Sequence, residues 1–158
     1  MKNRLSTFCF AFALIICAGL LEISAQVLKT EIIHLDDCIE TGGEKRFVIQ
    51  TKDEFLQAVR TDDAREKCLE SFGHLDFDAD SLLGIGLRTG YCRTPIGLRS
   101  QLVENKEEKR YEFDVTYIDP QNSICPEPRH YDLWLLAPKL PAGYEVVFSV
   151  KAVPPPND

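Results

Sequence analysis

The segment from Leu82 to Cys92, which reads LLGIGLRTGYC, constrains the fold of this 158-residue chain more than any other part. Its apolar residues alternate with Gly84 and Gly86, as in a buried strand, and it ends in a Gly-Tyr-Cys turn. Glycine inside a strand costs stability, so the two glycines indicate that another element approaches closely on their face. We expect side-chain packing there in preference to a ligand site. The residues that share the opposite face of the strand are Leu83, Ile85 and Leu87.

The residues after the turn predict a sheet of antiparallel strands. Apolar and polar residues alternate from Arg110 to Ile118, which is the pattern of a half-buried strand. This strand should pair as a hairpin with residues 97–104 across a charged loop at 105–109. Residues 131–137 are almost wholly apolar and predict a central strand, and residues 145–153 should close the sheet.

The residues before the glycine-rich segment predict two strands and two short helices. Thr51 and Glu54 have the spacing of a capping box, which places the start of a helix over residues 52–60. A second helix is expected over residues 63–71, and strands are expected over residues 27–35 and 46–50. The whole pattern predicts a mostly β (α+β) fold, an antiparallel sandwich-like sheet with one or two short helices near its start.

The first residues predict export from the cytoplasm. Lys2 and Arg4 precede an apolar run over residues 8–21, and Ala25 supplies a small residue before a cleavage point. The apolar run is shorter than the roughly 20 residues of a spanning helix. We therefore expect a secreted or periplasmic protein. Its parts would be a signal peptide at 1–25, a single globular domain at 26–153 and a Pro-rich tail at 154–158.

Lipid anchoring at Cys17 is disfavoured, because the bulky Ile16 stands where a lipoprotein signal has a small residue. The formal net charge is −7, and loss of the leader makes it more negative by one, since the leader holds two basic residues and one acidic residue. Nucleic acids and anionic membranes reward clustered Lys and Arg, so this charge argues against both as partners.

Four of the six cysteines would remain after removal of the leader, an even number that predicts two disulfides in an oxidising compartment. Four cysteines allow three pairings. Cys92 precedes the first strand of the predicted hairpin and Cys125 follows the second, so these two should lie close together. This favours the pairs Cys92–Cys125 and Cys38–Cys68.

No catalytic pattern emerges from the residues, so we predict a protein that is not an enzyme and needs no cofactor. A G-x-S-x-G nucleophile motif, a complete dinucleotide fingerprint and a C-x-x-C pair are all missing from the sequence. The acidic run at 76–80 lacks the glycine and glutamate of a calcium loop. The best local cluster is His34, Asp36 and Asp37, which leaves a metal-dependent hydrolase as an alternative.

The turn after the glycine-rich strand supplies the candidate binding residues. Loops on a rigid sheet are where recognition usually occurs, although a turn shaped only for disulfide geometry is an equally good explanation. The candidates are Thr89, Gly90, Tyr91 and Arg93.

From Leu75 to Val150 the order of features resembles the PrcB-like domain of exported bacterial proteins. The matching pieces are Asp76-Phe77, the Leu82–Gly86 strand, Thr89-Gly90-Tyr91 and the final strands from Tyr131 to Val150. The chain departs from that pattern by lacking one turn glycine and by placing Cys92 after the tyrosine. The resemblance implies an accessory that binds and stabilises a secreted protease complex. The Thr-Gly-Tyr turn is also similar to a loop of chagasin-type cysteine-protease inhibitors.

We therefore expect an exported, non-enzymatic protein-binding module whose partner is a protein, with a protease as one candidate. The loops at 89–95 and 119–128 would be held side by side by the Cys92–Cys125 disulfide and would form its binding surface. A chagasin-like inhibitor, the metal-dependent hydrolase and a structural envelope protein stay as alternatives.

Overall fold

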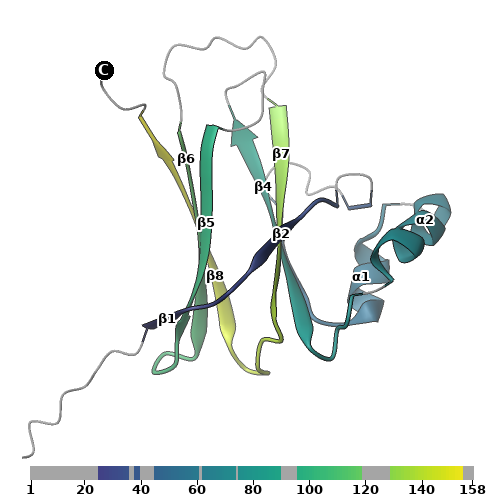
Figure 1. The fold of residues 1–158 in the computed structure, drawn as a ribbon, viewed down its shortest axis with the longest axis horizontal. Helices are drawn as coiled ribbons and strands as arrows, with labels where there is room; N and C mark the ends of the chain where they lie inside the picture. Colours follow the sequence, from purple (N-terminus) through teal and green to yellow (C-terminus); the bar gives the residue numbers. More distant parts are fainter. Residues whose placement is uncertain are drawn as a thin grey trace, which may run out of the picture.

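The computed structural model describes residues 25–35, 38–39, 45–60, 62–73, 75–89, 96–118 and 129–154. Two four-stranded sheets face one another, and two helices lie against the outer face of one of them (Figure 1). Sheet 1 has the strand order β1-β5-β6-β8, with β1 at Ala25–Val27, β5 at Ile96–Asn105, β6 at Arg110–Ile118 and β8 at Glu145–Val153. Sheet 2 has the order β2-β7-β4-β3, with β2 at Glu31–Ile33, β7 at Arg129–Pro138, β4 at Asp80–Thr89 and β3 at Arg46–Ile49.

The main core lies between the two sheets. In β6 every second residue is buried, which confirms the half-buried strand predicted from the alternation. Side chains from β4 and β7 meet these residues from sheet 2, since a strand directs alternate side chains to one face. The buried residues that the three strands contribute are Leu83, Ile85, Leu87, Tyr111, Phe113, Val115, Leu133, Leu135 and Ala137.

A second core lies between sheet 2 and the helices α1 (Lys52–Ala58) and α2 (Asp62–Phe72). The predicted capping box is present. The Thr51 hydroxyl accepts a hydrogen bond from the Glu54 amide at 3.2 Å, and the Glu54 carboxylate accepts from the Thr51 amide at 3.1 Å. The helix that begins there buries Phe55 against the sheet.

The close approach predicted at the glycine-rich strand is made by Trp134. Gly84 of β4 lies opposite Trp134 of β7, and the indole ring lies over the glycine. A Cβ atom on Gly84 would lie 2.3 Å from a ring carbon, so only glycine leaves room for the ring. The prediction of packing at Gly84 is confirmed, and the Trp134 side chain is fully buried.

A disulfide joins Cys38 to Cys68, with a Cα–Cα distance of 5.6 Å, and ties the segment after β2 to α2. This pair confirms one of the two predicted bridges. Cys92 and Cys125 lie outside the described residues, so the second bridge stays a prediction.

Two predictions about the strands need correction. The single strand expected over residues 27–35 is in fact two strands in different sheets. β1 pairs with β5, whereas β2 pairs with β7. Between them the Leu28 amide donates to the Leu102 carbonyl at 2.8 Å and the Leu28 side chain turns into the main core, so the chain bends across the open side of the sandwich.

The second correction concerns the last strand. β8 runs parallel to β6, while the other described strand pairs are antiparallel, as expected. The parallel pair arises because β7 lies in sheet 2. After β6 the chain crosses to sheet 2 and runs the opposite way as β7. It then returns to sheet 1 as β8, which therefore runs beside β6 in the same direction as β6.

Candidate functional site

The candidate loops are anchored at one end of the sandwich, the upper end in Figure 1. The ladder between β4 and β7 ends at the pair Thr89 and Arg129, and the ladder between β5 and β6 ends at Ile96 and Ile118. Residues 90–95 therefore lead from sheet 2 to sheet 1, and residues 119–128 lead back. Both connections cross between the sheets at the same end, which we call the loop end.

The structure places one of the four candidate binding residues. Thr89 is the last residue of β4 and lies at the loop end. Gly90, Tyr91 and Arg93 lie outside the described residues, so their contribution to binding stays a prediction. What the structure adds is the position of the strand ends that carry them.

A β-bulge forms the base of the loop end on sheet 1, and it was missed in the sequence. The pairing of β5 with β6 shifts register between Ile96 and Arg99, where Gly97 has a φ of 61°. The Ile118 side chain lies 2.7 Å from the position of a Cβ atom on Gly97, so both the backbone angle and the space favour glycine. Bulges often lie beside binding sites and redirect the chain that enters a strand. The signal in the sequence was a glycine within a strand directly after Pro95-Ile96.

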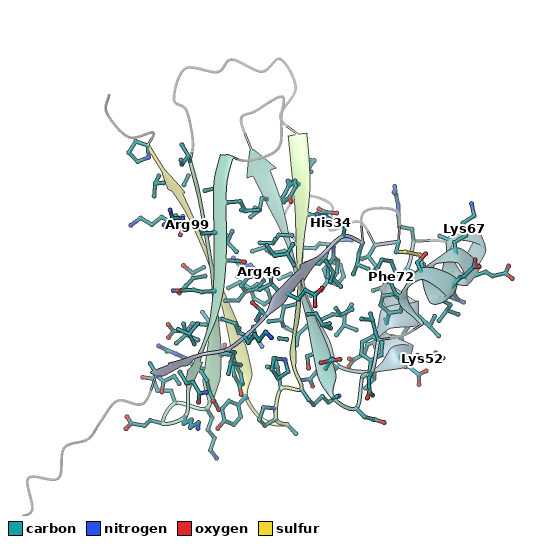
Figure 2. The ribbon with its side chains drawn as sticks, in the orientation of Figure 1. His34, Arg46, Lys52, Lys67, Phe72 and Arg99 are labelled. Atoms are coloured by element: carbon teal, nitrogen blue, oxygen red, sulfur yellow. A yellow bond between two sulfur atoms is a disulfide. The ribbon has the colours of Figure 1, made fainter. Side chains whose placement is uncertain are left out.

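The structure does not show whether His34, Asp36 and Asp37, the alternative site, come together. His34 is exposed just after β2 (Figure 2), and both aspartates lie outside the described residues. Within the described part of the chain, no three His, Cys, Asp or Glu side chains come close enough to hold a metal ion.

A group of charged residues surrounds the hairpin turn at the end opposite to the loop end. Arg110 lies 2.7 Å from a Glu108 carboxylate oxygen and 2.5 Å from one of Glu112. The pKa of Arg110 is raised, mainly by its hydrogen bond to Glu112; burial opposes this rise, and the negative charges of Glu108, Glu112 and Glu145 add to it. Arg110 therefore stays a cation, and these pairs stabilise the turn.

Tyr111 is the ionisable group whose pKa the fold changes most clearly in the described residues. Burial, followed by the nearby charge of Glu104, raises the pKa of Tyr111 to about 12. Its hydroxyl donates to a Glu104 carboxylate oxygen at 3.2 Å. A phenol held in this way stays protonated at neutral pH and is not available as a base or a nucleophile.

The outer face of sheet 1 carries a shallow hollow of about 170 Å³, lined by Arg99, Ser100, Gln101, Asp114 and Thr116 (Arg99 is labelled in Figure 2). Ligand sites for small molecules usually enclose roughly 300–1,000 Å³ and are mostly apolar. The Gln101 amide already donates to the Asp114 carboxylate at 3.2 Å. The hollow is therefore smaller than a typical small-molecule site, and two of its polar side chains already bind one another.

No protein-family model matches the chain, and neither the search of curated proteins nor that of solved structures gives a match. The part of the chain that the structure describes contains no helix long and apolar enough to cross a membrane.

Proposed function

We propose that the protein is an exported, non-enzymatic protein-binding module that contacts its partner through the loop end. The observation that carries this proposal is the position of the two terminal strand pairs, Thr89 with Arg129 and Ile96 with Ile118. They anchor two connections, of six and ten residues by their numbering, at the same end of a rigid sandwich. Connections held by a sheet are a common basis for protein recognition.

Two further features support the proposal. The Cys38–Cys68 disulfide is typical of proteins that fold in an oxidising compartment, which agrees with the signal-peptide pattern of residues 1–25. The ionisable groups whose pKa values are shifted, Arg110 and Tyr111, are both held in their ordinary protonated forms at neutral pH. The resemblance to the PrcB-like domain, a family of accessories to secreted proteases, makes a secreted protease the first partner to test.

The test is affinity capture with the oxidised, purified chain, using the exported fraction of the source cells as the sample. Tyr91→Ala and Arg93→Ala should each lose a stoichiometric partner that the unchanged chain retains. Lys106→Ala and Glu107→Ala provide matched controls, because both residues are exposed in the hairpin turn at the opposite end. Both control variants should retain the partner.

A partner that is retained by both loop variants would contradict the proposed surface. Absence of any stoichiometric partner would contradict the binding function itself. In that case metal analysis of the purified protein would test the His34 cluster next.

A further inference from the structure

β8 is a long edge strand with one open side. It lies at the end of sheet 1 beyond β6 and contains nine residues, whereas the other edge strands β1, β2 and β3 contain three, three and four. Within the described part of the chain, nothing pairs with its outer side. Proteins usually shorten, cover or charge such edges, because exposed backbone groups recruit another strand.

The backbone of β8 presents alternate residues to this open side. The Glu145 amide donates to the Lys109 carbonyl at 3.0 Å, so the odd-numbered residues of β8 direct their backbone groups toward β6. The even-numbered residues must then direct their N–H and C=O groups outward. These residues are Val146, Phe148, Val150 and Ala152.

The side chains on this edge are more apolar than an exposed strand requires. Val150 belongs to the row that faces the main core, yet 42% of its surface is exposed because no strand continues the sheet beyond it. Val147 on the opposite face is 37% exposed. Arg46 of β3 lies 5.8 Å from the centre of the Phe148 ring and partly closes the gap between the sheets (Arg46 is labelled in Figure 2). A further strand beside β8 would cover Val150 and extend the core.

We propose that the free edge of β8 pairs in antiparallel fashion with β8 of a second copy of this chain, around a two-fold axis at Phe148. The two copies of sheet 1 would then form one continuous eight-stranded sheet. Phe148 would lie opposite Phe148 of the partner subunit in a hydrogen-bonded pair. Val146 and Val150 would likewise lie opposite one another.

The charges of β8 select this register. With Phe148 at the centre, Glu145 lies opposite Lys151, and symmetry creates this pair twice. Both residues are exposed on the outer face of sheet 1 and would occupy a non-hydrogen-bonded position, where opposing side chains are closest. A shift of the centre to Ser149 would instead place Lys151 opposite Val147 and Glu145 opposite Val153.

The pairing has a consequence for the loop end. β8 runs toward the loop end, because Val153 pairs with Ile118 there. Two antiparallel β8 strands would therefore direct the loop ends of the two subunits away from one another. The dimer would be bivalent, and each loop end would remain open to its own partner. The β8 edge and the loop end are separate surfaces, so either proposal can fail without the other.

The test is sedimentation of the oxidised chain, purified from the compartment in which it accumulates, together with charge-reversal variants. The unchanged chain should show a concentration-dependent dimer. Glu145→Lys and Lys151→Glu should each weaken it about 25-fold, since two cross-strand pairs change from attraction to repulsion at about fivefold each. An equimolar mixture of the two variants should recover the dimer, because each lysine then faces a glutamate. Glu66→Lys, on the exposed side of helix α2 against the other sheet, is the matched control and should leave dimerisation unchanged.

A second measurement is independent of charge. Val150→Pro removes an N–H that faces the open side and leaves the ladder to β6 intact, so it should abolish the dimer while a folded monomer remains. In the unchanged chain, amide exchange at Val146, Phe148 and Val150 should slow as protein concentration rises. A chain that remains monomeric at about 0.2 mM would overturn the proposal. So would a dimer that neither charge variant weakens, or amides protected equally at every concentration, which would show that another segment of the same chain covers the edge.

Discussion

Adding a single methyl group at Gly84 should test the packing of sheet 2 most directly. In Gly84→Ala the new Cβ would lie 2.3 to 2.5 Å from three carbons of the Trp134 ring, whereas carbon atoms in contact are normally about 3.5–4.0 Å apart. The ring cannot withdraw into solvent, because Trp134 is fully buried and the Phe47 ring packs against it at a centroid distance of 5.4 Å. Overpacking of this kind costs about 3 kcal/mol at the upper end, and the lower backbone entropy of alanine offsets about 0.5–1 kcal/mol.

The expected net loss is thus about 2 kcal/mol of unfolding free energy, which corresponds to a fall in Tm of roughly 4–8 °C for a domain of this size. Urea unfolding followed by circular dichroism measures it. The chain has a single tryptophan, so in variants that keep it the fluorescence reports the environment of this same ring.

A double-mutant cycle isolates the contact between the two residues. In a Trp134→Leu background the ring is gone, so Gly84→Ala should be neutral or slightly stabilising there, which gives a coupling energy of about 2 kcal/mol. If Gly84→Ala were equally costly in both backgrounds, the glycine would be needed for some reason other than the ring. A coupling energy near zero would therefore refute the argument.

Two further predictions concern the disulfide and the buried tyrosine. Replacing both Cys38 and Cys68 by alanine opens a loop of 30 residues and should lower the unfolding free energy by about 3–4 kcal/mol, as measured by urea unfolding; a loss below about 1 kcal/mol would contradict it. The pKa of Tyr111 is raised from 10.0 to about 12, so the folded state holds the phenol proton more tightly than the unfolded state does. The contribution of this proton to the unfolding free energy is complete below pH 10 and should be lost as the pH rises toward 12. Urea unfolding midpoints measured from pH 10 to 12 should fall less steeply with pH in Tyr111→Phe than in the unchanged chain. An equal fall in both would contradict the raised pKa of Tyr111.

The features that the sequence predicted well depend on local patterns. The hairpin of β5 and β6 follows from alternation on either side of a short charged loop, and its pairing ends at Asn105 and Arg110, one residue further along β5 than expected. The capping box follows from two residues three positions apart. Even the Cys38–Cys68 pair was reached through the hairpin, because placing Cys92 beside Cys125 left only these two cysteines.

The features that the sequence did not predict depend on distant partners. The segment from Ala25 to Ile33 divides between two sheets because its partners, Asn105 and Trp134, lie far along the chain in different layers. The parallel direction of β8 likewise follows from β7 belonging to sheet 2, which no property of β8 itself reveals. At the loop end the sequence predicted which residues connect the strands. The bulge at Gly97 that directs one of those connections depends on its contact with Ile118, a residue of the neighbouring strand.

The distribution of surfaces in this fold limits where a partner can bind. The outer face of sheet 2 is closed by the two helices, which the Cys38–Cys68 disulfide holds to the segment after β2. The outer face of sheet 1 carries polar pairs such as Gln101 with Asp114 and Arg110 with Glu112, whose hydrogen bonds a protein partner would have to replace. The β8 edge offers outward backbone groups with no strand beside them among the described residues, and the loop end is where both connections between the sheets begin and end. Binding at an end and at an edge leaves both cores intact, so a partner could be gained or exchanged without loss of the stability that the sandwich requires.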